Sequence, residues 1–336
     1  MSIEIIIGLP HLCEGPLLSR ARALQQPVLI SANCLSIWST RRGWREWTGW
    51  KLHHLANAHS LHSLVLDSAG YAAMSVYGGF PWTVDSYVAL AAAFPFRWWA
   101  SLDYCVEQGV ARDREEVIDR LSRTIRANRD CRQRAADLGI TDTLMPVIQG
   151  RLPEDYERCI DALWGMMKPG AIIGVGSMCR REIDGPEGLI AVIDHLDRVL
   201  PKGVRLHAFG VKGPAIPYLL PFAHRIASLD SQAYGVSARR EAHQRRISKS
   251  DQLVADHMEH WLHTQRARLS ESARQLPVRA PAMPDPSPSD AWEAAIAQAR
   301  SEIRALIESG DLDHDELTAP WIEQWAADIY RDRRAA

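Results

Sequence analysis

The sequence predicts an α/β protein built as a (β/α)8 TIM-like barrel with a C-terminal helical extension. Eight short apolar runs recur within the first 230 residues, and stretches of about 20 to 40 residues with helical patterns separate most of them. The runs are continuously apolar rather than alternating, which is typical of parallel strands buried on both faces. Eight strand–helix units of this kind indicate a closed barrel.

The expected strands are residues 3–7, 27–32, 63–67, 98–103, 144–149, 171–176, 204–210 and 225–230. Between the fourth and fifth strands, residues 113–138 have the spacing of a long helix, with Val117, Leu121 and Ile125 on one face. An open doubly wound sheet is the competing architecture. No GxGxxG follows an early strand, so a dinucleotide-binding sheet has little support.

The predicted domain organisation is a barrel over residues 1–275, a proline-rich linker over 276–290 and an acidic helical tail over 291–336. The stretch PVRAPAMPDPSPSD (277–290) is typical of an extended linker. The residues after it are strong helix formers at helical spacing, and a second helix is expected over 319–331. We expect this tail to be an accessory helical hairpin that docks on the barrel or on a partner chain.

Composition and charge limit the class of protein. Hydrophobic content of 46% and charged content of 24% are those of a soluble globular protein, and no apolar run approaches the roughly 18 residues that span a bilayer. The six cysteines are scattered without a CxxC pair, which favours reduced thiols and a cytoplasmic protein. The net charge of −2 combines an acidic tail with a mildly basic body. Arginine clusters in that body permit a polyanionic partner, although a solvated helix face is the commoner explanation of any one cluster.

Polar residues follow several of the expected strands. Asp67, Asp103, Gln149 and Asp230 each stand at a strand end. A single aspartate there is most often a turn or helix cap. In a barrel, however, the carboxyl ends of all strands surround one mouth, where active sites lie. The joint occurrence therefore predicts one site that holds three carboxylates and a carboxamide.

This set of side chains favours chemistry on a purine base at a glycosidic bond. An aspartate can act as nucleophile or as general acid and base, and glycosidases need two carboxylates. A further carboxylate and carboxamide suit the hydrogen-bonding edge of a guanine-like ring, which Gly174 and Gly176 would let approach the backbone. His207 is expected to be a satisfied core histidine, and Cys105 and Cys179 lack the neighbouring base that a thiol nucleophile needs.

The motifs at these positions resemble those of the tRNA-guanine transglycosylase superfamily. LVLDSAGYAAM resembles its DSGG-type motif, LMPVIQG its GIQGG-type strand end, AIIGVGS its base-binding loop and HAFGVKG its LMGVG segment; SLDSQAYG resembles the segment that holds the nucleophile. All appear in family order over residues 60–235. Where the motif residues differ from those of the tRNA enzymes, they are most similar to the DpdA-like 7-deazaguanine DNA transglycosylases.

The resemblance implies a role for each matching residue. Asp230 is implied as the nucleophile that attacks the anomeric carbon, and Asp67 as the acid/base. Asp103, Gln149 and Ser68 are implied to bind the base, together with the backbone around Ile173, Gly174 and Gly176. The implied reaction replaces guanine in DNA by a 7-deazaguanine, 7-cyano-7-deazaguanine being the expected one. DNA and that base are thus the expected partners, other DNA-modification proteins are further candidates, and no membrane is involved.

Two departures from the tRNA enzymes argue against tRNA as the substrate. No cysteine follows Cys179, so the zinc cluster of those enzymes cannot form, and no metal or other cofactor is expected. A distinct tRNA-gripping domain is also absent. A tRNA-guanine transglycosylase and a non-catalytic nucleic-acid-binding barrel remain the alternatives.

Basic and aromatic residues supply candidate nucleic-acid contacts. Arg180, Arg181, Arg239 and Arg240 follow two site motifs, where phosphate contacts would fall. The stretch WSTRRGWREWTGW (38–50) interleaves tryptophans with arginines. These tryptophans either stack on unpaired bases or pack a long loop onto the barrel, and the sequence does not separate the two.

Overall fold

The computed structural model of the protein describes residues 3–41, 45–107, 109–179 and 181–276, and, nearer the C-terminus, residues 291–292, 294–296, 298–299, 302–303 and 319–335. The chain divides into two compact units, Met1–Arg274 and Gln275–Ala336. Residues 277–290 of the predicted linker lie outside the described residues.

The first unit is the predicted barrel. Its main sheet contains β1 (Glu4–Leu9), β2 (Pro27–Ser31), β5 (Ser63–Asp67), β6 (Trp99–Ala100), β7 (Leu144–Met145), β8 (Val147–Ile148), β9 (Ile172–Val175), β10 (Arg205–Ala208) and β11 (Ile226–Ser231). All pairings in this sheet are parallel, in the order β7-β6-β5-β2-β1-β11-β10-β9-β8. The fold class predicted from the sequence is confirmed.

The sheet closes through one interrupted strand. β7 and β8 stand at opposite ends of the strand order, yet only Pro146 separates them in the chain. Proline has no N–H for the ladder, which accounts for the break. The carbonyl of Pro146 still accepts from the Gly174 amide at 2.8 Å, so residues 144–148 act as one strand that joins β6 to β9. The nine strand segments therefore occupy eight strand positions.

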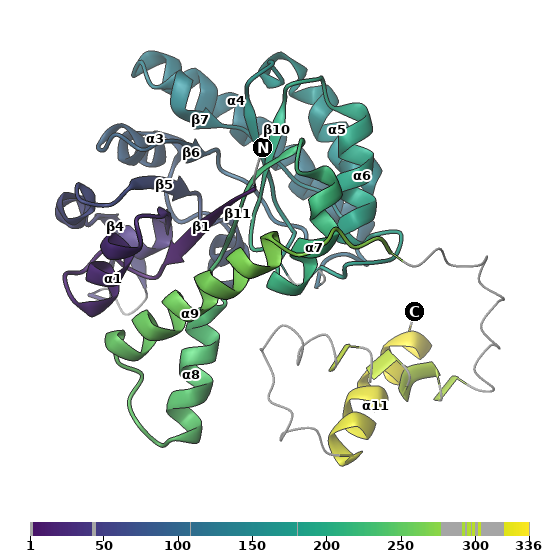
Figure 1. Ribbon diagram of the computed structural model, residues 1–336. Coiled ribbons are helices and arrows are strands. Elements are labelled where there is room, and N and C mark those ends of the chain that lie inside the picture. The colour runs from purple at the N-terminus through teal and green to yellow at the C-terminus, as the bar shows by residue number, and fades with distance from the viewer. Residues whose placement is uncertain are drawn as a thin grey trace. The chain divides into compact units, whose positions relative to one another are not determined.

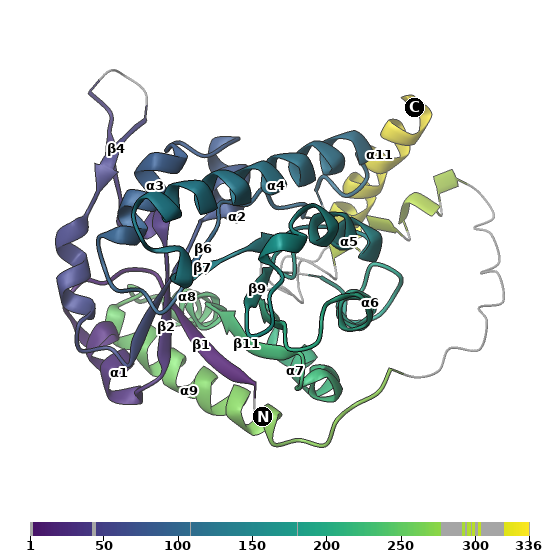
Figure 2. The same cartoon turned by 90° about the horizontal axis from the view of Figure 1, so that it is seen from above.

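Helices surround the strands, as the view from above shows (Figures 1 and 2). The α-helices of this unit are α1 (Pro16–Leu24), α2 (Gly70–Ala72), α3 (Val84–Ala92), α4 (Arg114–Asp137), α5 (Pro153–Ala162), α6 (Leu189–Val199), α7 (Ile216–Leu219), α8 (Tyr234–Gln244) and α9 (Asp251–Leu269). A 3-10 helix, Leu52–Ala58, stands in the place of an α-helix after β2, and the antiparallel pair β3 (Ser36–Ser39) and β4 (Glu46–Trp50) precedes it.

Helix starts follow the capping signals in the sequence. Asp113 precedes α4 and its side chain accepts from the Glu116 amide at 3.1 Å, while Ser250 caps α9 through the Leu253 amide at 3.2 Å. In α4, Val117 and Leu121 are buried as predicted, whereas Ile125 is only partly buried, and the polar Thr124 and Asn128 lie inward. Asn128 is buried there because it bonds the Val147 backbone.

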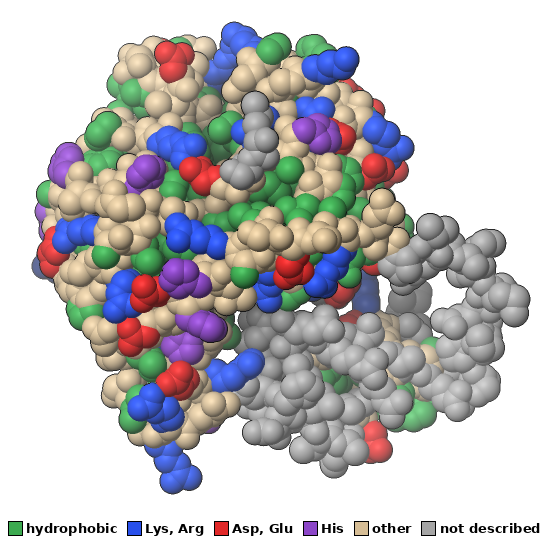
Figure 3. Space-filling view, viewed as in Figure 1, with side chains coloured by type: hydrophobic (Ala, Val, Ile, Leu, Met, Phe, Trp, Pro, Cys, Tyr) green, Lys and Arg blue, Asp and Glu red, His purple; other side chains and the backbone are tan. Residues whose placement is uncertain are grey.

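The helices α8 and α9 pack on each other, α9 also packs on α1, α7 and β1, and the connection between the two helices projects from the barrel; we call this hairpin the arm (Figure 1). α8 begins three residues after β11 ends, and the connecting residues 245–250 are exposed. Lys and Arg side chains lie at the free end of the arm (Figure 3), where Arg245, Arg246 and Lys249 are located. The arm is therefore a basic projection that starts at the carboxyl end of a barrel strand.

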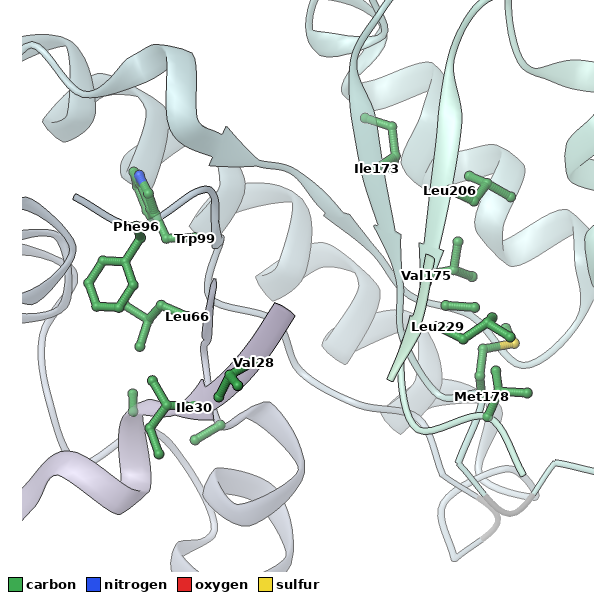
Figure 4. Close-up of a cluster of buried hydrophobic side chains, with 14 of the residues drawn as sticks. Val28, Ile30, Leu66, Phe96, Trp99, Ile173, Val175, Met178, Leu206 and Leu229 are labelled. Carbon is green, nitrogen blue, oxygen red and sulfur yellow. The ribbon is translucent and has the colours of Figure 1, made fainter. Parts of the chain in front are cut away.

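Two hydrophobic layers pack the barrel. The inner layer fills the lumen with Ile6, Leu29, Val65, Trp98, Ala100, Met145 and Val147. The outer layer lies between strands and helices and includes the side chains of Figure 4, among them Val28, Ile30, Leu66, Val175 and Leu206. Adjacent residues of a strand thus alternate between the layers, as the pleat requires.

The second unit contains helical residues between 291 and 303 and the helix α11 (Ala319–Ala335). Ala295, Ala299, Ala326 and Ile329 form its own small hydrophobic cluster. The Trp325 indole donates to Glu302 at 2.8 Å. Within the residues described, the tail is thus a packed pair of helices.

Candidate active site at the carboxyl ends of the strands

Strand alternation directs the predicted site residues into the barrel mouth. Val65 and Val147 belong to the inner layer, and Asp67 and Gln149 stand two residues further along the same chain segments. Side chains two residues apart in a strand share a face. Asp67 and Gln149 therefore point to the lumen at its carboxyl end, where barrel enzymes place their chemistry.

Asp67 has an unusual protonation equilibrium. Burial, followed by the negative charges of Asp103 and Asp230, raises the pKa of Asp67 to about 7. Its Oδ2 also accepts from the Ala69 amide at 3.1 Å, and Ala69 has a φ of 70°, so the aspartate does cap a tight turn. The cap and the site coexist, and the three carboxylates influence one another because the carboxyl ends of β5, β6 and β11 surround one mouth.

Asp103 links the loops that follow three strands. Ser68 Oγ donates to its Oδ1, and Gln149 Nε2 donates to its Oδ2 at 2.5 Å. Asp103 is 7% exposed, and burial raises its pKa. A Cβ on Gly70 would lie 2.6 Å from the Asp103 carbonyl oxygen, so the small residue in DSAG permits this close approach. Ser68 is fully buried, and its hydroxyl holds Asp103 in place.

Gln149 is fixed from both ends of its carboxamide. Its Oε1 accepts from Ser177 Oγ at 2.6 Å while its Nε2 donates to Asp103. A Cβ on Gly176 would lie 2.0 Å from Gln149 Nε2. Glycine is needed here to make room for the protein's own carboxamide, which differs from the predicted reason, the approach of a ring.

Gly174 and Ile173 lie in β9 and face opposite ways. A Cβ on Gly174 would lie 2.7 Å from the Phe209 ring, so this glycine accommodates packing in the lumen. The Ile173 side chain is fully buried in the outer layer (Figure 4). Only the backbone of Ile173 is then left for a base to contact.

Asp230 is held by one of its two carboxylate oxygens. It is the penultimate residue of β11, and its Oδ1 accepts from the Gly210 amide at 2.9 Å. Its side chain is 12% exposed. Its Oδ2 makes no hydrogen bond to a described residue, so this oxygen is left for a ligand in the mouth.

His207 is a site residue that the sequence reasoning missed. It was expected to be a satisfied core histidine, but its Nε2 lies 3.3 Å from Asp230 Oδ1 and forms no hydrogen bond. The signal that could have found it is the pleat: Phe209 stands two residues after His207, just past the end of β10, so the two side chains lie on one face, and Phe209 packs against the inner layer.

The predicted phosphate contacts separate into three cases. Arg181 is only 2% exposed, and its guanidinium donates to the carbonyls of Gly150, Arg151, Ser177 and Glu187 and to the Tyr156 hydroxyl. The prediction is therefore wrong for Arg181, because a buried guanidinium with these partners cannot reach a phosphate. Arg180 lies outside the described residues. Arg239 and Arg240 are exposed on α8.

For two tryptophans of the 38–50 stretch the structure supports the packing interpretation. Trp47 and Trp50 pack on each other and on Trp82, with ring centroids 4.9 to 6.2 Å apart, which anchors the loop to the barrel. Trp38 instead lies 4.6 Å from the Tyr77 ring, and the Arg45 guanidinium stacks 4.3 Å from Trp38. Residues 42–44 of this stretch lie outside the described residues.

The structure also bears on metal sites, cysteines and membrane spans among the described residues. No group of three or more His, Cys, Asp or Glu among the described residues could hold a metal ion, and His257 pairs with Glu241 at 2.8 Å. None of the six cysteines, all of which are among the described residues, forms a disulfide, and burial raises the pKa of Cys105 to about 12, which keeps its thiol protonated. Within the described part of the chain, no helix has the length and apolar character needed to cross a membrane.

A hollow at the opposite end of the barrel does not include the carboxylates of the candidate site. It is lined by Arg97, Trp98, Met145, Lys168 and Ile172 among others, near the amino ends of β6, β7 and β9. The carboxylates lie at the carboxyl ends, so we place the candidate site there.

A match to a known protein family identifies the family of this chain. The family model for DpdA, DeoxyPurine in DNA protein A, matches residues 37–306. The chain belongs to the DpdA family. The match includes all three carboxylates, Gln149 and His207, and it makes the protein a DpdA-type DNA-modifying enzyme. No curated protein matches the chain.

Proposed function

We propose that this DpdA family member is a DNA guanine transglycosylase, which exchanges guanine in DNA for a 7-deazaguanine through a covalent aspartyl-glycosyl intermediate. The observation that carries the proposal is that one mouth holds two carboxylates in different environments. Asp230 is anchored through Oδ1, and Asp67 has a pKa near neutrality. A nucleophile and a proton carrier are the two groups that base exchange needs.

In the first displacement, Asp230 Oδ2 forms a bond to the anomeric carbon and the bond from that carbon to the guanine nitrogen breaks. The departing base takes the electron pair, and protonated Asp67 supplies the proton. In the second displacement, the incoming base loses its ring N–H proton to Asp67, its nitrogen bonds the anomeric carbon and Asp230 leaves as carboxylate. Asp67 ends protonated, as it began.

The pair Asp103 and Gln149 is the proposed reader of the base. Each carboxylate oxygen of Asp103 accepts one hydrogen bond from the protein and can accept another. A guanine-like edge offers neighbouring N–H groups that fit such a carboxylate. A 7-deazaguanine lacks the ring nitrogen that assists guanine departure, so the exchange would run one way. We take 7-cyano-7-deazaguanine as the first base to test.

Aromatic and basic residues around the mouth support DNA as the polymer. The Trp38–Tyr77 pair belongs to the loops that follow β2 and β5, at the carboxyl end of the barrel. Exposed arginines on α8 lie beyond β11. Aromatic rings can stack on unpaired bases, and arginines contact phosphates. Reaching an anomeric carbon in a duplex requires flipping the nucleotide out.

The test incubates the purified protein with 7-cyano-7-deazaguanine and either duplex DNA or tRNA, followed by digestion to nucleosides and mass spectrometry. The expected product is the 7-deazaguanine deoxynucleoside from DNA. Product from tRNA alone would instead assign the tRNA reaction. Asp230→Asn should abolish exchange, and retained activity would exclude Asp230 as nucleophile. If neither polymer is modified and no covalent adduct forms, the non-catalytic alternative stands.

A further inference from the structure

His207 is a buried histidine beside the proposed nucleophile with one nitrogen unused. It is fully buried on β10, and its Nε2 is 3.3 Å from Asp230 Oδ1 but not aligned as a hydrogen bond. A buried polar atom without a partner is costly, so such atoms in native proteins call for an explanation. Here the neighbour is a carboxylate oxygen at contact distance.

The ring is held in a fixed orientation by its surroundings. Its Nδ1 lies 2.8 Å from Ser228 Oγ, and Ser228 stands opposite His207 in the β10–β11 register. The rings of Trp98 and Phe209 pack at 4.9 and 4.5 Å. Because Ser228 and Asp230 share a face of β11, one strand fixes both the partner of Nδ1 and the carboxylate near Nε2.

We infer that His207 is a positioning residue for Asp230, acting through an Nε2–H directed at Oδ1. The inference rests on the proposed function. When the Ser228 hydroxyl donates to Nδ1, the neutral ring carries its proton on Nε2, which faces Asp230. The Gly210 amide already donates to Oδ1, so aligning the Nε2–H would give Oδ1 two donors, and Oδ2 is the oxygen left for the sugar.

This arrangement acts on both displacements. When Oδ2 bonds the anomeric carbon, Oδ1 becomes the carbonyl oxygen of the ester and keeps its two donors. When the incoming base attacks, the bond from Oδ2 to the sugar breaks and charge returns to the carboxylate. Preorganised donors at Oδ1 stabilise that charge as it develops. His207 therefore matters most for resolving the adduct.

The kinetic test compares His207→Leu, which removes the donor, with His207→Gln, whose side-chain amide can donate in its place. Removing one such donor costs on the order of 100-fold in rate. We expect His207→Leu to lower kcat for exchange by about that factor while KM for the base changes less than about twofold. We expect His207→Gln to recover most of kcat. His207→Leu should also accumulate covalent adduct with guanine-containing DNA, seen on denaturing gels in the presence of the incoming base.

Unchanged kcat in His207→Leu would overturn the inference, as would equal losses in the Leu and Gln variants with a raised KM, since both results indicate packing alone. Ser228→Ala is a second variant that preserves the ring and removes the group that sets its tautomer. We expect a smaller loss of kcat, about tenfold.

A tautomer measurement separates this inference from the proposed function. Nitrogen-15 NMR of the histidine rings, with the His207 signal assigned by its loss in His207→Gln, should show the proton on Nε2. In Ser228→Ala, the His207 ring proton should lie on Nδ1 or be distributed between the two ring nitrogens. A His207 proton on Nδ1 in the wild type would overturn the inference whether or not exchange is observed.

Discussion

At the scale of single residues, the three aspartates differ by environment rather than by type. Asp103 is enclosed by Ser68 and Gln149, Asp230 is anchored through one oxygen, and Asp67 is destabilised as an anion by burial and by the other two charges. Neighbouring carboxylates whose environments differ in this way can divide acid, base and nucleophile roles. Asp67 is the one suited to move protons near neutral pH.

We predict that adduct formation with guanine-containing DNA declines as pH rises through about 7, the pKa of Asp67. The departing guanine needs the protonated form, which is lost above that pH. The measurement is the single-turnover rate of adduct formation across pH 5.5–9. In Asp67→Asn the rate should be low at every pH, and a wild-type rate that rises through this window would contradict the assignment of Asp67 as the acid.

The same raised pKa has a consequence for stability. A carboxyl whose folded-state pKa lies above its unfolded value favours folding at low pH, and this contribution is lost as pH rises from about 4 to about 7. Asp67→Asn stays neutral and can still accept from the Ala69 amide. The free energy of unfolding of Asp67→Asn minus that of the wild type should therefore be larger at pH 7.5 than at pH 4.5. Urea titration at the two pH values measures this difference.

At the scale of elements, all eight strand positions could be predicted because parallel strands buried on both faces leave short, continuously apolar runs. The pleat of each strand decides which residues of a run face the lumen. His207 and Gly174 face inward through it, while Ile173 faces the helices. The break at Pro146 is visible in the sequence as a proline within a strand.

Arg181 shows what could not be predicted at this scale. The sequence presents Arg180-Arg181 as one basic pair after a glycine-rich loop, and only tertiary packing reveals that the second guanidinium is enclosed by four carbonyls. Burial of a charged side chain depends on partners distant in sequence, here the chain near Gly150 and Glu187.

We predict that Arg181→Ala lowers the free energy of unfolding by about 3 kcal/mol, since it leaves several buried carbonyls without a donor. Urea titration followed by circular dichroism measures the change. Arg239→Ala is the matched control, an exposed arginine on α8, and should fall within about 0.5 kcal/mol of wild type. Equal stability of the two variants would contradict the structural role of Arg181.

The α8–α9 arm yields a different prediction for its exposed arginines. Each phosphate that a cation neutralises adds about 0.9 to the slope of log affinity against log salt for duplex DNA. If Arg239 and Arg240 each contact a phosphate, Arg239→Ala/Arg240→Ala should reduce that slope by about 1.8. Fluorescence anisotropy with a labelled duplex at several salt concentrations provides the measurement.

The matched control for the arm is Arg198→Ala, an exposed arginine near the end of α6. It lies toward the amino ends of the strands, because α6 leads into β10, so its removal should leave the slope unchanged. The same slope in the arm variant and in wild type would show that α8 does not contact the phosphates.

At the scale of the whole molecule, the two compact units carry opposite charge. Residues 275–336 hold twelve acidic residues and six arginines, a net of −6, while the total for the chain is −2. The unit Met1–Arg274 therefore carries +4. Net charge affects association with a polyanion over distances set by ionic strength, independently of any particular contact. The acidic tail should thus oppose non-specific binding of DNA by the whole chain.

We predict that removing residues 275–336 strengthens non-specific duplex binding at about 0.03 M salt and that the gain shrinks above about 0.3 M, where screening confines charges to a few ångströms. Truncation removes mass as well as charge, so the control is the full chain with Asp311, Asp313, Asp315 and Glu316 changed to their amides. These changes bring the tail from −6 to −2. If charge is the cause, this variant should recover about two thirds of the gain in binding free energy. A gain on truncation without one in the amide variant would show that the tail obstructs DNA by its bulk.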